Sequence, residues 1–348
     1  MRIKWIDALR GYGAIGVVLV HLIQAMQERE LLGSGFVFDY LLNGARAVQL
    51  FFMITGLTTF MVLDSKSGGG TLNYYKKRWL AIFPTYILMS IVYLLLGHGY
   101  SLIKMGDDKV PFTIGALLLN ILGLSGFSPK YINIVPGGWY VGIVVIYYIL
   151  APFIRKIVNS TSQAVKFCFV ALVVRIGFHT LSSILFDGNE EISAWADMFI
   201  LNQLVFIAIG QLLYFILIKK DVKITKVDQM FVATAILYVT LQVDSLMLWS
   251  LFIVSFIIMA ACIENSILIN KLSLLFGKYS FEIYLLHNAI IYLFFYFAPR
   301  IQVHQYVDLG IAFILILIVT LIASVGLNNG MKFVKKNLSE NRKELSHG

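Results

Sequence analysis

The segment IDALRGYGAIGVVLVHL, residues 6–22, opens the first long apolar run of the chain and already indicates its fold class. It carries Asp7 and Arg10 at one end and His21 deep inside the apolar run. A charged side chain at the centre of a bilayer costs about 2.5–3.5 kcal/mol on insertion scales, so polar groups at that depth usually face a partner or a cavity. The segment therefore predicts a membrane helix whose histidine has a specific partner or task.

The rest of the chain repeats this apolar pattern. Of its 348 residues, 59% are hydrophobic and 14% are charged, and the mean hydropathy is +0.82. A helix that crosses a bilayer needs about 20 mostly apolar residues, and continuous rather than alternating runs exclude a β-barrel. We therefore expect an all-α polytopic membrane protein with about ten transmembrane helices. The predicted spans are 11–31, 41–63, 79–97, 138–158, 164–186, 197–218, 228–243, 246–264, 281–298 and 307–331.

The loops between these spans set the expected topology. The run 112–127 is short and interrupted by Gly and Ser, which favours a re-entrant or interfacial helix over a full crossing. Basic residues gather in alternate loops, so the positive-inside rule places both termini in the cytoplasm. We expect one membrane domain over 1–331 and a basic cytoplasmic tail over 332–348. This asymmetry accounts for the net charge of +9 without nucleic acid, and most of these charges suit topology and contact with lipid head groups.

Arg10 and His21 form the first pair of candidate functional residues. They are eleven positions apart, which is close to three helical turns and about 16 Å along the axis. One face of the first helix thus presents a cation at the cytoplasmic surface and an imidazole near mid-membrane. A buried histidine is often a structural residue. Here the shared face and the depth favour a functional role.

A second candidate group is YYKKRWLAIFPTY, residues 74–86, at the cytoplasmic end of the third predicted span. Lys77 and Arg78 are suited to a phosphorylated cytoplasmic ligand, although a cluster that only sets topology would have the same composition. Pro84 frees backbone carbonyls next to Tyr86, and such a break is tolerated where it lines a cavity.

Further polar residues fall inside predicted spans. Glu282 and His287 enter the ninth span, where each is costly without a partner. Arg175 and His179 are four residues apart in the fifth span, so they share a helical face and indicate another polar site. The two cysteines, Cys168 and Cys262, lie in apolar runs and indicate neither a disulfide nor a metal site.

These residues resemble the acyltransferase family 3 membrane proteins, which are bacterial inner-membrane O-acyltransferases of surface glycans. In that family an arginine is followed after ten residues by a histidine, as Arg10 and His21 are here. Five blocks occur in the family's order, which is more specific than any single one. They are DALRGYGAIGVVLVH at 7–21, LFFMITGLTTF at 50–60, KKRWLAIFPTY at 76–86, GWYVGIVVIYYILAP at 138–152 and LFGKYSFEIYLLH at 275–287.

The sequence departs from the family pattern at two positions. Ala81 stands where the family often has a second arginine, three residues after Arg78. Val144 stands where the family has a glutamate in its tryptophan-containing helix. Both changes leave the acyl-donor contacts and the role of that glutamate open in this chain. We expect Glu282, from its depth, to substitute in part for the missing carboxylate.

The resemblance implies an enzyme that transfers an acyl group to a hydroxyl. His21 is the expected general base, because an imidazole titrates close to neutral pH, with Arg10 and Glu282 as the other catalytic candidates. The resemblance implies acyl-CoA bound from the cytoplasm, with arginines near its phosphates and its pantetheine arm directed toward His21. Direct transfer and a covalent acyl-enzyme both remain open. The residues expected to bind acyl-CoA are Arg10, Lys77, Arg78 and Tyr86.

The acceptor is expected to bind near the outer end of the fourth span, opposite its cytoplasmic end. Trp139, Tyr147 and Tyr148 offer aromatic faces to sugar rings, although aromatic residues also anchor helices at a membrane interface. Arg46 suits a pyrophosphate or an acidic sugar, and His287 completes the expected acceptor-binding set.

The expected function is therefore transfer of an acyl group, acetyl in the first place, from cytoplasmic acyl-CoA to a hydroxyl of a cell-surface glycan. The acceptor is expected as O-antigen, capsule or exopolysaccharide, or as its lipid-linked precursor, with no tightly bound cofactor and no metal. The expected location is the bacterial inner membrane. Three alternatives remain at this stage, namely a transporter or flippase of a lipid-linked saccharide, transfer of succinyl or another acyl group to a lipid or small molecule, and a member of the family that has lost catalysis.

Overall fold

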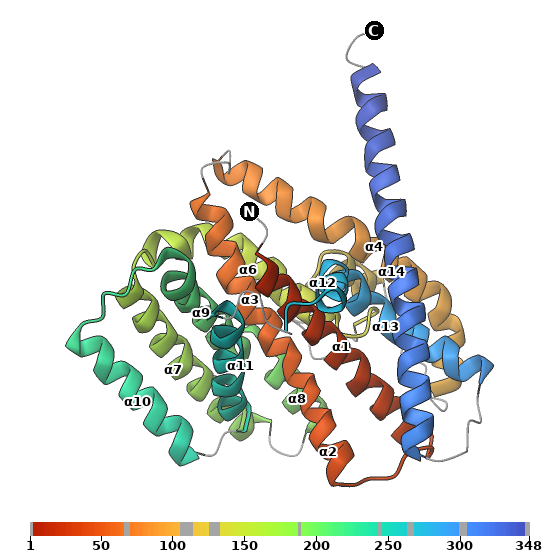
Figure 1. The fold of residues 1–348 in the computed structure, drawn as a ribbon, viewed down its shortest axis with the longest axis horizontal. Helices are drawn as coiled ribbons and strands as arrows, with labels where there is room; N and C mark the ends of the chain where they lie inside the picture. Colours follow the sequence, from red (N-terminus) through yellow and green to blue (C-terminus); the bar gives the residue numbers. More distant parts are fainter. Residues whose placement is uncertain are drawn as a thin grey trace. The chain divides into compact units, whose positions relative to one another are not determined.

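The computed structural model describes residues 3–65, 70–104, 114–124, 133–186, 189–242, 245–262, 268–298 and 305–344. Within these ranges the chain forms helices and contains no strand, which confirms the all-α prediction (Figure 1). The helices are α1 (Lys4–Gln27), α2 (Phe36–Leu42), η1 (Asn43–Arg46), α3 (Ala47–Asp64), α4 (Gly70–Lys104), α5 (Ile114–Ile121), α6 (Gly138–Ile157), α7 (Thr161–Leu185), α8 (Glu190–Met198), α9 (Ile200–Leu213), η4 (Tyr214–Lys219), α10 (Lys226–Gln242), α11 (Ser245–Cys262), α12 (Lys271–Lys278), α13 (Ser280–Phe297) and α14 (Gln305–Glu344).

Eight segments of the described chain are helical, long and apolar enough to cross a membrane. Each corresponds to one of the predicted spans, and the polytopic membrane architecture is thereby confirmed. The segments are Lys4–Gln27, Phe36–Asp64, Gly70–Leu96, Gly138–Ile157, Thr161–Leu185, Trp195–Lys219, Ser280–Phe297 and Tyr306–Phe333.

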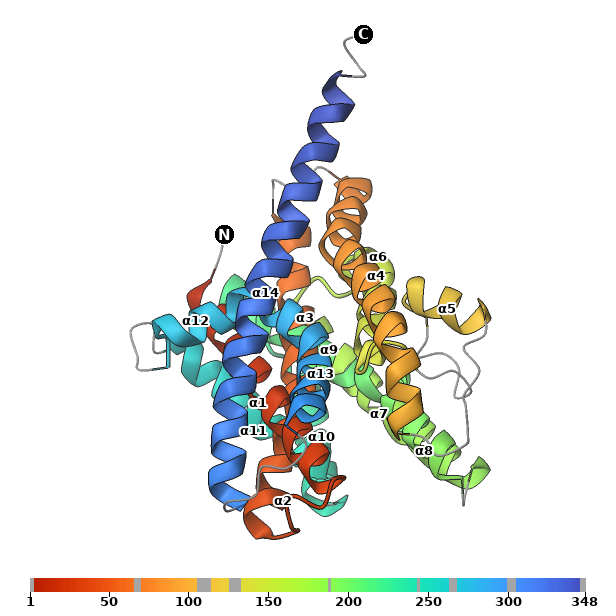
Figure 2. The ribbon, with the colours of Figure 1, turned by 90° about the vertical axis from the view of Figure 1, so that its right-hand side faces the viewer.

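The other predicted membrane elements are present as shorter helices. The spans expected at 228–243 and 246–264 correspond to α10 and α11, and the apolar part of α11 over Leu248–Cys262 is shorter than the eight. The segment expected as a re-entrant or interfacial helix contains α5, which has only 8 residues. Helix α14 continues through Glu344, so the described part of the expected basic tail extends the last helix (Figure 2).

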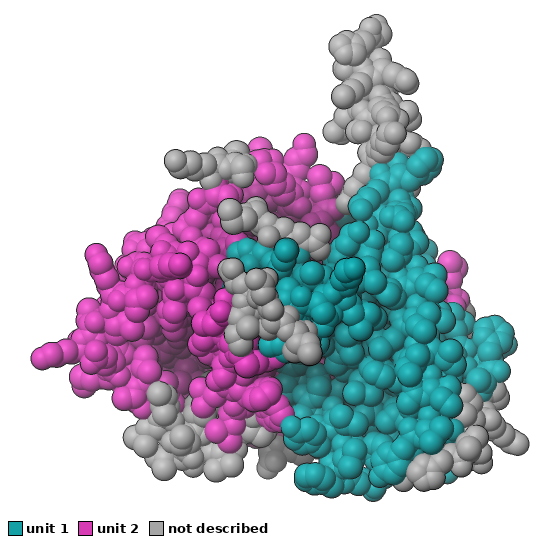
Figure 3. Space-filling model, viewed as in Figure 1, with its two compact units in different colours: residues 1–47, 84–93, 265–348 teal, residues 48–83, 94–264 magenta. Residues whose placement is uncertain are grey.

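The chain divides into two compact units, which are coloured separately in Figure 3. Unit 1 comprises residues 1–47, 84–93 and 265–348, and unit 2 comprises residues 48–83 and 94–264. The expected boundary between a membrane domain and a tail near residue 331 stays a prediction.

Unit 1 is built around α1. This helix packs against α12 and α13, and α13 in turn packs against α14 (Figures 1 and 2). Glycines allow the close approach of α1 and α12, because a Cβ atom at Gly277 would overlap the backbone carbonyl of Asp7. Asn270 and Ser273 form a capping box that begins α12 at this contact. The sequence around the arginine end of α1 is therefore held in place by backbone-to-backbone packing.

Unit 2 contains a second close helix contact, between α3 and α9. A Cβ atom at Gly56 would overlap the carbonyl oxygen of Ile207, and one at Gly210 would overlap that of Met53. Small residues at such crossings let the backbones of membrane helices approach closely. Helix α7 packs against α9 and α10 in the same unit.

Candidate functional site

His21 lies beside a second histidine in unit 1. The ring centroids of His21 on α1 and His287 on α13 are 5.0 Å apart, and the ring planes are inclined by 38°. His287 is buried, at 1% exposure, whereas His21 is half-buried. The packing of α1 against α13 thus joins two histidines that lie at opposite ends of the sequence.

Hydrogen bonds fix the ring of His287. Its Nδ1 atom lies 3.1 Å from the carbonyl oxygen of Ile283, one turn earlier in α13. Its Nε2 atom lies 3.1 Å from the side-chain amide nitrogen of Asn288. Both ring nitrogens of His287 are therefore engaged by residues of its own helix.

Tyr93 holds the same turn of α13. Its hydroxyl donates to the carbonyl oxygen of Leu285 and accepts from the backbone N–H of Ala289, both at 3.0 Å. In a regular helix this carbonyl and this N–H bond to each other, so the hydroxyl bridges the two groups. The segment of α4 within unit 1 thereby fixes the backbone on either side of His287.

Arg10 and Glu282 each have a partner in unit 1. Arg10 Nη1 lies 3.9 Å from Asp7 Oδ1, one turn earlier in α1, and the arginine side chain is 35% exposed. Glu282 is buried and accepts a hydrogen bond from the side-chain amide of Asn328 on α14, at 2.6 Å. The buried carboxylate of Glu282 therefore has a neutral amide of the neighbouring helix as its hydrogen-bond partner.

Arg78 occupies a different environment, in unit 2. Its guanidinium lies over the ring of Tyr148, with Cζ 4.6 Å from the ring centroid, and over that of Tyr74 at 5.5 Å. Its Nε and Nη2 atoms are buried, and no hydrogen-bond acceptor meets them within the described part of the chain. The aromatic faces attract this cation, but they do not supply hydrogen-bond acceptors for its Nε–H and Nη2–H groups.

A cavity of about 340 Å³ opens beside Arg78 between α4 and α6 of unit 2. Its walls are almost entirely apolar, and Trp79 and Phe83 stack on each other at one side, with ring centroids 3.7 Å apart. Lys77, the neighbour of Arg78, is exposed. The cavity therefore combines an apolar interior with one cationic side chain in its lining, that of Arg78.

Residues 3–328 match the model of the acyltransferase 3 family, described as an acyltransferase domain. The chain belongs to the acyltransferase 3 family. The resemblance drawn from the five sequence blocks is thereby confirmed, and the protein is a membrane acyltransferase. Searches of curated proteins and of solved structures gave no match.

The two departures from the family pattern have different surroundings in this acyltransferase. Ala81 is exposed on α4, one turn after Arg78. Val144 is buried on α6, at 4% exposure, where a carboxylate would need a partner. Glu282, which we expected to replace that carboxylate, lies in unit 1 and Val144 in unit 2.

Three of the residues predicted to bind the acceptor lie on α6 of unit 2, and each has its own neighbours. Trp139 on α6 contacts Phe52, with ring centroids 5.9 Å apart. The hydroxyl of Tyr147 accepts a hydrogen bond from Gln211 at 3.0 Å and is fully enclosed. Tyr148 lies against Arg78, so this aromatic side chain meets the cation that was predicted to bind the acyl donor.

Two more predicted site residues lie in unit 1. Arg46 ends η1 and is half-buried. Tyr86, expected near acyl-CoA, is fully buried on α4. The roles proposed for both residues stay predictions.

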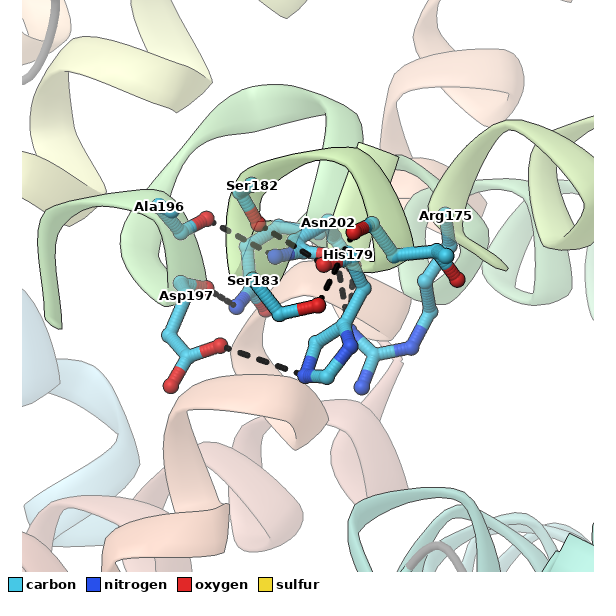
Figure 4. A network of polar contacts seen from close by, with 9 residues as sticks. Arg175, His179, Ser182, Ser183, Ala196, Asp197 and Asn202 are labelled. Atoms are coloured by element: carbon cyan, nitrogen blue, oxygen red, sulfur yellow. Dashed lines mark hydrogen bonds and ion pairs between the residues drawn. The ribbon is translucent and has the colours of Figure 1, made fainter. Parts of the chain in front are cut away.

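Arg175 and His179 are neighbours on α7, as their spacing predicted (Figure 4). Arg175 is buried and donates to the carbonyl oxygen of Asn202 at 3.0 Å, while the side chain of Asn202 donates to the carbonyl of Ala196. These bonds link α7 to the segment where α8 ends and α9 begins. His179 Nε2 lies 4.0 Å from Asp197 Oδ1, and both side chains are largely exposed. The group therefore joins the body of α7 to the end of α8 and the beginning of α9 in the acyltransferase.

Sequence reasoning missed Asn288 and Tyr93 as neighbours of the histidine pair. Asn288 directly follows His287, so a second polar residue inside an apolar run was the available signal. The hydroxyl of Tyr93 gave no signal, because tyrosine is common in membrane helices and its contact with α13 is long-range.

Proposed function

We propose that this membrane acyltransferase moves an acyl group, acetyl in the first place, from cytoplasmic acyl-CoA to a hydroxyl of a cell-surface glycan or its lipid-linked precursor. The observation that carries the proposal is the half-buried His21, held beside His287 in a helix long and apolar enough to cross a membrane. An imidazole at that depth is the group that O-acyl transfer needs as a base.

The chemistry assigned to His21 is general base catalysis. The acceptor oxygen attacks the thioester carbonyl while its O–H proton passes to the imidazole of His21. The new C–O bond forms, the C–S bond breaks, and the CoA thiolate takes up the proton from the imidazolium. Glu282 and Arg10 remain secondary catalytic candidates, and each has a partner within unit 1.

The donor is assigned mainly to the side chains around Arg78. Its buried Nε–H and Nη2–H groups lack acceptors among the described residues, and phosphate oxygens would supply them. Lys77, which precedes Arg78 in α4, adds an exposed positive charge to the same helix. The proposal keeps Arg10 and Tyr86 as further donor contacts and assigns Tyr148 to the donor, because this ring already lies on Arg78.

The acceptor is assigned to a glycan on the side of the membrane opposite the acyl-CoA. Trp139 and Arg46 remain the residues proposed to contact it, whereas Tyr147 has its hydroxyl engaged by Gln211. The same proposal places the protein in the bacterial inner membrane with both termini in the cytoplasm, on the distribution of basic residues.

The test measures release of CoA thiol from acetyl-CoA by the protein in membranes, with and without a lipid-linked glycan. The glycan is checked by mass for the gain of one acetyl group. We expect His21→Ala to lower turnover by about 10² to 10⁴-fold, the usual contribution of a general base.

His179→Ala is the matched control, because this histidine lies in α7, is 58% exposed and pairs with Asp197. It should keep native turnover. Native turnover in His21→Ala would remove the base from α1. Transfer from succinyl-CoA but not from acetyl-CoA would correct the acyl group and leave the rest of the proposal intact.

A further inference from the structure

The bonding partners of His287 define which of its nitrogens carries hydrogen. Nδ1 faces the carbonyl oxygen of Ile283 at 3.1 Å, and a carbonyl only accepts, so Nδ1 carries the proton. Nε2 faces the amide nitrogen of Asn288 at 3.1 Å, and an amide NH₂ only donates, so Nε2 is the acceptor. His287 is thus a neutral ring with one defined tautomer.

This bonding pattern leaves His287 without an open lone pair. A general base must offer an unengaged nitrogen to the proton it removes. The Nε2 lone pair of His287 is used by Asn288, and its Nδ1–H is used by Ile283. His287 is therefore poorly suited to act as the base or to accept a hydrogen bond from an incoming hydroxyl.

We propose that His287 and Asn288 are positioning residues for His21, an inference that rests on the proposed function. Asn288 holds His287 as the neutral Nδ1–H tautomer, and the ring of His287 in turn sets the orientation of His21 at a centroid distance of 5.0 Å. In many active sites a neighbouring group fixes the orientation of a histidine ring, and the hydrogen bonds of that ring fix its tautomer.

A neutral partner matters because His21 becomes a cation when it takes the acceptor proton. A second cationic imidazole at the same distance would repel it in the low dielectric of the membrane. A neutral ring presents a π face that attracts the new charge. The proton removed from the hydroxyl therefore resides on His21 alone until the CoA thiolate takes it, and His287 keeps its Nδ1–H throughout.

The backbone around His287 is built to keep this arrangement. Tyr93 bridges Leu285 and Ala289, which lie on either side of His287 in α13. The ring of Tyr284 adds a further contact, with its centroid 6.0 Å from that of His287. The imidazole is thus fixed by hydrogen bonds at both nitrogens and by a held turn.

The first test reads the tautomer directly and does not need activity. The protein is labelled with ¹⁵N-histidine, and the signals of His287 are assigned by their loss in His287→Gln. We expect a protonated Nδ1 and an unprotonated Nε2 in the native protein without substrates. Asn288→Asp keeps the shape of the side chain but presents only acceptors, so it should move hydrogen onto Nε2.

The second test measures kcat and the KM for the acyl donor. Asn288→Leu and Asn288→Asp should each lower kcat about tenfold, the equivalent of one hydrogen bond, and leave the donor KM unchanged. The control is Ser90→Ala, which removes another buried hydrogen bond of unit 1, from the Ser90 hydroxyl to the carbonyl of Tyr86 at 2.9 Å. It should keep native kcat.

The outcomes separate this inference from the proposed function. Hydrogen on Nε2 of His287 in the native protein, or native kcat in both Asn288 variants, would overturn the positioning role while acyl transfer by the native protein still stood. If the tautomer is as expected but the native protein transfers no acyl group from any donor, the proposed function fails and the positioning role fails with it.

Discussion

Two arginines of unit 2, Arg155 and Arg78, show how differently one fold can satisfy the same side chain. Arg155 Nε and Nη2 donate to the two carboxylate oxygens of Asp64 at 2.8 and 2.7 Å, and the Tyr214 hydroxyl donates to the same carboxylate. Arg78 has the faces of Tyr74 and Tyr148 but no acceptor for two of its buried nitrogens among the described residues.

The difference teaches where to look for a ligand. A guanidinium that binds a carboxylate through two hydrogen bonds has acceptors for its N–H groups and contributes to stability. A guanidinium on aromatic faces with unbonded N–H groups retains a desolvation cost that an incoming anion would relieve. On this basis we propose that Arg155 serves stability and that Arg78 binds the acyl donor.

The largest expected effect is on stability, at Arg155, whose N–H groups have a carboxylate partner. Asp64→Ala leaves Arg155 without its carboxylate and should lower the free energy of unfolding by about 2 kcal/mol, less than for a fully buried pair because both side chains are partly exposed. Thermal unfolding in detergent checks this. Tyr214→Phe removes one hydroxyl and is the milder control. An unchanged unfolding midpoint in Asp64→Ala would show that the ion pair contributes nothing.

The next effect is on the binding of acyl-CoA, at Arg78, which has two buried nitrogens without acceptors among the described residues. Arg78→Ala should raise the KM for acyl-CoA about tenfold, which corresponds to the loss of one charge-assisted hydrogen bond, and leave the unfolding midpoint unchanged or higher. Arg155→Ala is the matched comparison and should do the reverse, lowering the midpoint at constant KM. If both variants behave alike, the contrast between the two arginines has no functional meaning.

The smallest effect concerns the ring beneath Arg78. Tyr148→Leu removes the aromatic face and should raise the donor KM about threefold, in line with an attraction of about 0.5–1 kcal/mol. Tyr148→Phe keeps the face and should leave the KM at the native value. A rise in KM for Tyr148→Phe equal to that for Tyr148→Leu would assign the effect to the hydroxyl instead of the ring.

The sequence predicted the architecture well because the bilayer imposes it locally. Length and hydropathy of each run are properties of about 20 consecutive residues, and eight spans were located this way. The family was also predictable, since five blocks in a fixed order identify it and the family match covers residues 3–328. The contact between His21 and His287 was not predictable, because no local rule relates two residues so distant in sequence.

Assignments to the donor and acceptor sides were harder to make from the sequence. Tyr148 was grouped with Trp139 because both lie on one apolar run. The structure adds its contact with Arg78, and its role in binding stays a prediction. Spacing along α6 gives the face on which a side chain lies but not the helix that faces it. Likewise the carboxylate partner of Arg155 is Asp64, at the end of another helix.

The sequence by itself determined that this chain is a helical membrane protein of the acyltransferase 3 family, with an arginine and a histidine three turns apart on its first helix. Hydropathy and the order of motifs are properties of consecutive residues, so they can be determined without knowing how the helices pack. Only the tertiary structure decided which polar groups meet. The contact between His21 and His287, the bridge made by Tyr93 and the unbonded nitrogens of Arg78 all follow from helix packing, which brings together groups that the sequence keeps apart.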